Sequence, residues 1–300
     1  MLCGIVRLIS VVLMMNRSTK SLRKHLLSGG RSYGPFLLSD SPIVAELLST
    51  VGYGHIVVDH EHGPTDIRSG MAMLQAIDAA YATFGASTDQ NSPAPMRTEP
   101  IVRVPAHDPV YMKKVLDTLR LPAGVLVPMV NDAETARQVV KSTRYPTGKN
   151  GDLDGNRGCA APVVRGSAWG MLGNDYYLEQ TKQDLLVMVQ VETPQAIQAV
   201  PEISQVEGID GIFIGPLDLS ASIGKMGQFD DPQVQELIAS AEQAVRESPV
   251  FLAGFRAPGR SVKDMFEAGY QLVCGSVDLA LLREAAKADL AQATDSTEVL

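Results

Sequence analysis

The sequence predicts a (β/α)8 barrel, a TIM-barrel α/β fold, and three observations support this fold class. Eight short β-branched or apolar runs occur between residues 34 and 275, and helical stretches follow them. Long segments separate consecutive runs, as parallel strands require, rather than two-residue hairpin turns. The chain has 300 residues, and one such barrel needs about 250. A doubly wound sheet is the alternative, but no GxGxxG motif follows the first run.

The strand predictions rest on short runs rich in Val, Ile and Leu. The segments IVV at 56–58, GVLVP at 124–128 and GIFIG at 211–215 are typical of strands buried on both faces. The expected strands cover residues 34–38, 55–59, 100–104, 124–128, 185–191, 211–215, 250–254 and 272–275.

The helix predictions rest on helical spacing of apolar residues and on start signals. Ser41 and Asp108 each precede a proline, which is a typical helix start. The expected helices cover residues 42–51, 65–84, 109–119, 132–143, 174–183, 231–247, 260–268 and 278–291. Two polar segments, 85–98 and 144–173, are expected to form surface loops, and loops this long are often functional.

Composition limits the function classes. The net charge of −8 argues against a basic surface that binds nucleic acids. The three cysteines lie far apart in the sequence and do not have the spacing of a disulfide framework. Residues 1–30 are predicted to be an N-terminal extension that is either targeting or disordered, and residues 31–300 the barrel with its C-terminal helix. Residues 1–15 are too short an apolar run to span a bilayer. The extension is interpreted as dispensable or as a mitochondrial presequence, and the expected location is cytoplasmic without membrane contact.

Four ionisable residues end the second predicted strand. Asp59, His60, Glu61 and His62 follow the run IVV directly. In a barrel, side chains at the carboxyl ends of strands meet at one mouth, where active sites form. His62 is the strongest acid–base candidate because it follows Glu61 at this end. The alternative is a solvated loop without a role in catalysis.

Three further charged residues end other predicted strands. Glu192 ends the fifth strand and Asp218 follows the sixth, so their oxygens can meet on one divalent cation. Two carboxylates suit Mg²⁺ or Mn²⁺ better than Zn²⁺. Arg103 ends the third strand, where it can stabilise an enolate oxygen. The alternatives are that both acids cap helices and that Arg103 forms a structural ion pair.

Several segments together resemble one known family. They are VDHEHGP (58–64), VRVPAHDPVYMKKVLD (102–117), GVLVPMVNDAETARQVVKSTRYP (124–146), Arg157-Gly158, VQVET (189–193) and GIFIGPLDLSASIG (211–224). In this order they are similar to the class II, metal-dependent pyruvate aldolases of the HpcH/HpaI type, which include macrophomate synthase. The resemblance spans about residues 34–290. One departure is Phe36, which stands where the family has Trp.

The resemblance implies a role for each matching residue. Glu192 and Asp218 would bind the metal, which would be Mg²⁺, Mn²⁺ or Co²⁺, and Arg103 would hold the keto or enolate oxygen. His62 would transfer the proton with Asp117 as its partner. The remaining implied residues are Gln190, Gly215 and Leu217, which would line the substrate site together with Arg103. Glu61 would support the water shell of the metal, and Asp59 would have a structural role or would contact the site residues without touching the substrate.

The resemblance also implies a reaction. The chain would be a lyase that cleaves or forms a carbon–carbon bond of a small 4-hydroxy-2-oxo acid through a pyruvate enolate. Decarboxylation of oxaloacetate, as by a macrophomate synthase-like enzyme, is an alternative because it uses the same enolate. A non-catalytic structural barrel is a second alternative. No lysine ends a matching strand, which argues against a Schiff-base aldolase. Family members are homo-oligomers, usually trimers or hexamers.

Overall fold

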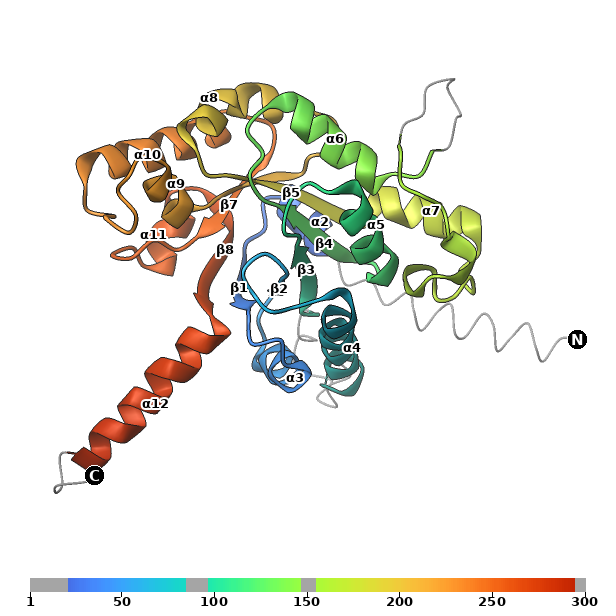
Figure 1. Cartoon of the computed structure of the whole chain (residues 1–300), viewed down its shortest axis with the longest axis horizontal. Coiled ribbons are helices and arrows are strands. Elements are labelled where there is room, and N and C mark those ends of the chain that lie inside the picture. Colours follow the sequence, from blue (N-terminus) through green and yellow to red (C-terminus); the bar gives the residue numbers. More distant parts are fainter. Residues whose placement is uncertain (1–20, 85–96, 147–154, 295–300) are drawn as a thin grey trace, which may run out of the picture.

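Eight parallel strands form a closed barrel in which their order follows the sequence (Figure 1). The structure is a computed structural model that describes residues 21–84, 97–146 and 155–294. The strands are β1 (Ser32–Leu37), β2 (His55–Asp59), β3 (Glu99–Arg103), β4 (Ala123–Val127), β5 (Leu185–Val191), β6 (Gly211–Ile214), β7 (Phe251–Phe255) and β8 (Tyr270–Val277). The predicted (β/α)8 fold is thereby confirmed, and every strand end lies within two residues of its predicted position.

Helices surround the barrel. They are α2 (Leu22–Leu27), α3 (Pro42–Val51), α4 (Ile67–Phe84), α5 (Pro109–Thr118), α6 (Ala133–Thr143), α7 (Asn174–Gln183), α8 (Pro194–Ile203), α9 (Pro216–Ser222), α10 (Pro232–Arg246), α11 (Val262–Glu267) and α12 (Asp278–Thr294). The predicted caps are present, because the Ser41 and Asp108 side chains accept backbone N–H groups of α3 and α5. Two short 3₁₀ turns, Ala161–Val163 and Arg165–Ser167, lie within the predicted long loop. The predicted loop at 85–98 lies almost entirely outside the described residues.

Side chains alternate along each strand between the inside and the outside of the barrel. The hydrophobic core therefore has two layers, one inside the barrel and one between the strands and the helices. The inward residues include Phe36, Val57, Ile101, Leu126 and Phe213. The outward residues, such as Ile56, Val58 and Val102, pack against the helices. This two-residue period places Asp59 and Arg103 on the inner side at the carboxyl ends of their strands, and the register pairs these two residues directly.

Helix α2 closes the amino end of the barrel, although it falls within the predicted N-terminal extension. Leu22 and Leu26 are buried in the interior cluster. Burying a leucine of this kind contributes about 1.5–3 kcal/mol. The Arg23 side chain donates two hydrogen bonds to Asp210, of 2.8 and 2.9 Å. The part of the extension from residue 21 onward therefore belongs to the barrel, while residues 1–20 lie outside the described residues.

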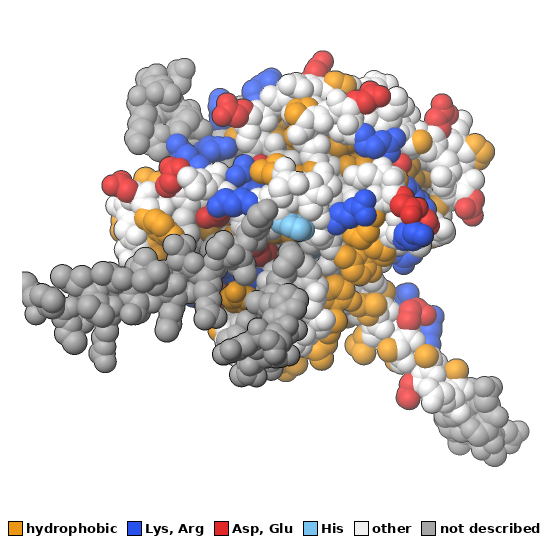
Figure 2. Space-filling view, turned by 180° about the vertical axis from the view of Figure 1, so that it is seen from behind, with side chains coloured by type: hydrophobic (Ala, Val, Ile, Leu, Met, Phe, Trp, Pro, Cys, Tyr) orange, Lys and Arg blue, Asp and Glu red, His pale blue; other side chains and the backbone are white. Residues whose placement is uncertain are grey.

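Helix α12 points away from the barrel instead of packing beside it (Figure 1). Leu279, Leu281 and Leu282 of this helix are exposed. Hydrophobic side chains also gather on the barrel next to the start of α12 (Figure 2). Among the described residues, no helix is both long enough and apolar enough to cross a bilayer.

Candidate active site

The carboxyl ends of β2 and β3 hold a buried ion pair. The Arg103 guanidinium donates from Nε to Asp59 Oδ1 (2.8 Å) and from Nη2 to Asp59 Oδ2 (2.6 Å). Its Nη1 lies 2.9 Å from Glu61 Oε2. Asp59 is fully buried, and the Arg103 guanidinium carbon lies 4.6 Å from the centre of the Phe36 ring. This bidentate, stacked arrangement fixes the guanidinium plane at the mouth of the barrel.

Glu61 is therefore bound to Arg103, and its surroundings affect its charge. Burial raises the pKa of the Glu61 carboxyl to about 7, while the positive charge of Arg103 opposes this shift. The negative charges of Asp59 and Asp218 raise the pKa further. The charge of Asp218, which follows β6, thus affects the pKa of Glu61, which follows β2. The two strand ends therefore lie close enough for their charged groups to interact.

The end of β5 presents a second buried carboxylate. Glu192 is 2% exposed, and Gln190 Nε2 donates to its Oε2 across 2.5 Å. The backbone N–H of Met129, which follows β4, donates to its Oε1 across 2.7 Å. Burial raises the pKa of Glu192 to about 7 in spite of these two hydrogen bonds, and the charge of Asp218 adds to the shift.

Gly215 and Asp218 complete this side of the mouth. A Cβ on Gly215 would lie 3.0 Å from both Glu192 Oε2 and Gln190 Nε2, so a side chain there would press on the carboxylate. Asp218 lies in the first turn of α9, and Leu217 beside it is half exposed. The structure thus brings Gln190, Glu192 and Gly215 into one cluster, with Asp218 at its edge. The two strands that carry or precede these residues, β5 and β6, are neighbours in the barrel.

The donor set of this cluster fits a hard divalent cation. Its available atoms are oxygens, namely those of Glu192 and Asp218 and the Gln190 Oε1, which is buried without a partner in the described structure. No group of three or more His, Cys, Asp or Glu side chains in the described part of the chain has a metal-binding arrangement. Two carboxylates would supply only part of a coordination shell, which fits Mg²⁺ because this cation usually keeps several waters.

The two members of the predicted proton-transfer pair lie apart. The His62 side chain is 56% exposed at the mouth, with its Nε2 3.8 Å from Glu61 Oε2. Asp117 lies in the last turn of α5, which runs back from the mouth toward the amino ends of the strands. Its Oδ1 accepts a hydrogen bond of 2.7 Å from Arg157. Within one described chain, Asp117 therefore belongs to a cluster with Arg157 rather than with His62.

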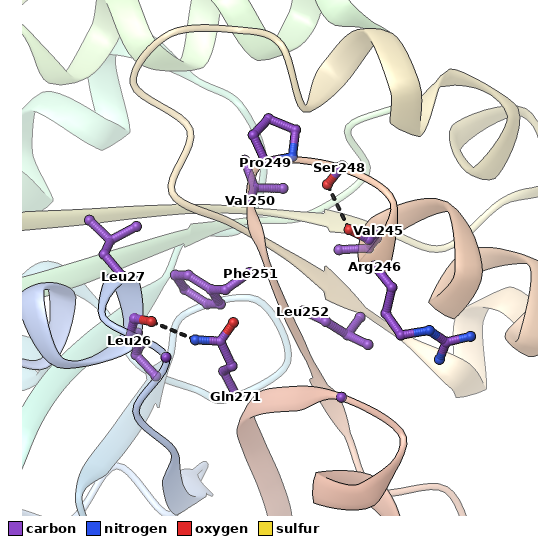
Figure 3. Close-up of a pocket in the computed structure, with 12 residues that line it drawn as sticks. Leu26, Leu27, Val245, Arg246, Ser248, Pro249, Val250, Phe251, Leu252 and Gln271 are labelled. Carbon is purple, nitrogen blue, oxygen red and sulfur yellow. Dashed lines mark hydrogen bonds between the residues drawn. The ribbon is translucent and has the colours of Figure 1, made fainter.

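A groove of about 330 Å³ lies at the opposite end of the barrel from the mouth (Figure 3). It is bordered by Leu26 and Leu27 of α2, by Phe251 at the start of β7, and by Gln271. None of the predicted site residues lines it. The groove is therefore separate from the candidate active site.

Two contributors to the mouth are not among the residues that the sequence predicts. Met129 has a φ of +57°, a left-handed conformation, and its N–H donates to Glu192, and no local signal in the sequence predicts either feature. Phe36 forms the aromatic surface under Arg103, and it was noted only as a departure from a family pattern.

Comparison with known proteins identifies the family. The HpcH/HpaI aldolase/citrate lyase family model matches residues 32–285. The chain belongs to this family. It is 35% identical over 268 residues to a 4-hydroxy-2-oxo-heptane-1,7-dioate aldolase of Escherichia coli, which covers 89% of this chain and 92% of that protein. Family membership confirms the predicted resemblance and the predicted enzyme class, a carbon–carbon lyase.

Solved structures agree with this membership. An HpcH/HpaI aldolase/citrate lyase family protein from Burkholderia cenocepacia has a TM-score of 0.80 and 31% identity, and the match covers 91% of this chain and 98% of that chain. Macrophomate synthase has a TM-score of 0.74 at 22% identity, with 92% and 90% of the two chains covered. The second match shows a shared fold.

Proposed function

We propose that this HpcH/HpaI family member cleaves, and in reverse forms, the C3–C4 bond of a 4-hydroxy-2-oxo acid through a pyruvate enolate. The observation that carries the proposal is the meeting of two groups at one mouth. One is the clamped Arg103 with Asp59 and Glu61, and the other is the buried Glu192 with Asp218. The named aldolase relatives support the same reaction class.

Glu192 and Asp218 would hold a divalent cation, for which Mg²⁺, Mn²⁺ and Co²⁺ are the candidates. Such a cation supplies Lewis acidity, which favours electron withdrawal into the 2-oxo group. Gln190 and the Met129 N–H orient the Glu192 carboxylate, and Gly215 leaves room for it. The raised pKa of Glu192 fits this role, because a buried carboxylate near a second one needs a cation to stay ionised.

Arg103 is placed to stabilise the developing enolate charge. Two of its five N–H groups are donated to Asp59, and Nη1 forms an ion pair with Glu61, so three N–H groups make no hydrogen bond within the described structure and can serve a ligand. Because Asp59 holds the guanidinium rigidly, these donors need no reorganisation when negative charge develops on the substrate oxygen. Asp59 and Glu61 thereby act through Arg103 rather than by touching the substrate.

His62 is proposed as the group that moves the proton of the 4-hydroxyl. Removal of this proton turns the hydroxyl into the aldehyde as the C3–C4 bond breaks, and the electron pair of the bond becomes the enolate. His62 is exposed at the mouth and lies beside Glu61, so it can exchange protons with solvent. Its proposed partner Asp117 would have to come from a second copy of the chain, since the Asp117 of the same chain lies at the far end of α5.

Two features support a homo-oligomer. Helix α12 leaves its own barrel and carries exposed leucines, as described above. Ile43, Leu47 and Val51 on α3 are between 57% and 77% exposed, and their four-residue spacing forms one apolar stripe. We propose that α12 of a neighbouring copy covers the apolar surface near α3, in a trimer or a hexamer.

The test is pyruvate release from 4-hydroxy-2-oxo acids with and without a chelator. EDTA is expected to stop the release, and added Mn²⁺ or Mg²⁺ to restore it. Activity that survives EDTA would contradict the metal role. An aldehyde co-product supports aldol cleavage, whereas CO₂ from oxaloacetate without an aldehyde would support decarboxylation instead.

A further inference from the structure

Asp278, the first residue of α12, directly follows β8 and links it to the turn after β1. It is 5% exposed although it is charged. Its Oδ1 accepts the backbone N–H of Leu38 (2.9 Å) and of Leu279 (2.8 Å), and its Oδ2 accepts the N–H of Ser39 (3.0 Å). One carboxylate thus receives three backbone N–H groups, two of which belong to the turn that follows β1.

The turn after β1 has few other bonds to hold it. Ser39 Oγ and Asp40 Oδ1 are buried without a hydrogen-bond partner in the described structure. Asp40 has a φ of +54°, a conformation that is costly for a residue other than glycine. Hydrogen bonds to a charged group are roughly twice as strong as neutral ones. The two that Asp278 accepts from Leu38 and Ser39 are therefore the main restraint on this turn.

This turn lies close to the segment that carries the candidate proton carrier. A Cβ on Gly63 would lie 3.5 Å from the carbonyl oxygen of Leu38 and 2.7 Å from that of Asp59. Gly63 follows His62 directly. The negative charge of Asp40 is also felt by His60 on the same segment, where it opposes the lowering of the pKa by burial. The backbone that follows His62 therefore lies next to the turn that Asp278 holds, with no room for a side chain at Gly63.

We propose that Asp278 is a positioning residue that fixes the backbone around His62 through the Leu38–Ser39 turn. It does not touch the substrate; it sets where the proton carrier stands relative to Arg103. The importance of that placement rests on the proposed lyase function. Because Asp278 also begins α12, a change in the direction of this helix would be transmitted to the mouth by the same hydrogen bonds.

The experiment compares Asp278→Asn with the wild-type full-length protein. The amide keeps the size of the side chain but replaces one acceptor oxygen by a donor, which would face a backbone N–H. Amide hydrogen–deuterium exchange is followed in peptides that cover residues 36–41, 59–66 and 189–193. We expect faster exchange in the first two and no change in the third. Unchanged exchange in 59–66 would overturn the proposal, because a residue that only begins α12 would loosen the helix and the β1 turn alone.

Kinetics supply the second readout. The kcat of Asp278→Asn is expected to fall roughly tenfold, the rate equivalent of one lost charge-assisted hydrogen bond, while the Mn²⁺ dissociation constant stays unchanged. A kcat equal to that of the wild type would contradict the proposal. Asp231→Asn is the control, since Asp231 also precedes the body of a helix, α10, and accepts a local backbone N–H, that of Gln233, but contacts no part of the mouth. If the wild type releases no pyruvate, the proposed function fails, while the exchange comparison still decides the role of Asp278.

Discussion

The backbone N–H of Met129 donates to Glu192 Oε1 across 2.7 Å, and Met129 itself adopts a left-handed conformation. Such a conformation costs a residue with a Cβ about 1–2 kcal/mol and costs β-branched residues more. Strain of this kind concentrates at functional sites. The relationship places one of the two hydrogen bonds that orient the proposed metal ligand on a backbone group, so only a substitution that disturbs the backbone at this position would remove it.

The first prediction concerns this strained residue. Met129→Val should weaken Mn²⁺ binding about tenfold, because a β-branched side chain opposes the left-handed φ and withdraws the N–H from Glu192. Met129→Gly should bind Mn²⁺ about as well as the wild type, since glycine adopts this φ freely. Calorimetric titration of the metal-free protein measures both constants. Equal affinities for the valine and glycine variants would show that the backbone conformation does not position the carboxylate.

The second prediction concerns the guanidinium clamp. Arg103→Lys keeps the positive charge but cannot form two parallel hydrogen bonds with Asp59. We expect kcat for pyruvate release to fall by about 10²–10³, the usual effect of removing one donor from a developing oxyanion. Arg23→Lys is the matched control, because Arg23 makes the same bidentate contact with Asp210 at the other end of the barrel. The control should lose stability without losing kcat, and a similar kcat loss in both variants would argue against a catalytic role.

The third prediction concerns pH and the closure of the barrel by α2. Glu99 is 5% exposed and accepts the Leu22 N–H across 2.8 Å. Burial raises the pKa of Glu99 to about 7 from its ordinary value of 4.5. Between these values the folded state binds more protons than the unfolded state, so the free energy of unfolding falls as the pH rises through this interval.

Glu99→Gln removes this dependence while it keeps an acceptor oxygen for Leu22. Above pH 7 the variant should therefore be more stable than the wild type by up to about 3 kcal/mol, and the gain should disappear below pH 4.5. Urea unfolding at several pH values measures the difference. Glu236→Gln, on the exposed side of α10, controls for the change in net charge. A gain that is the same at every pH would show that Glu99 does not titrate in this range.

The fourth prediction concerns assembly. Leu47→Glu places a charge in the middle of the exposed stripe on α3, where burying it unpaired is costly. The variant should have a lower mass in light scattering than the wild type. Because the proposed Asp117 partner comes from a second copy, its pyruvate release should fall together with the mass. Met226→Glu, at a residue that is 71% exposed, is the control and should change neither quantity. A wild-type mass for Leu47→Glu would place the subunit contact elsewhere.

The fold and much of the mouth follow from the sequence by itself. The strands are runs of β-branched residues whose burial is decided locally, and parallel strands joined by helices bring all carboxyl ends to one side. For this reason Asp59, Glu61, Arg103 and Glu192 could be assigned to one mouth from their positions at strand ends. Matching motifs then added Asp117, Gln190, Gly215 and Leu217, which strand-end positions alone did not single out.

Only the tertiary structure decided which of these groups touch. The clamp of Asp59 and Glu61 on Arg103 depends on strand register, and the N–H of Met129 meets Glu192 from 63 positions away in the sequence, so neither can be inferred from local pattern. The separation of Asp117 from His62 depends on the direction in which α5 returns along the barrel. These contacts join residues far apart in the chain, and long-range packing, unlike hydrophobic periodicity, leaves no regular signal in the order of the amino acids.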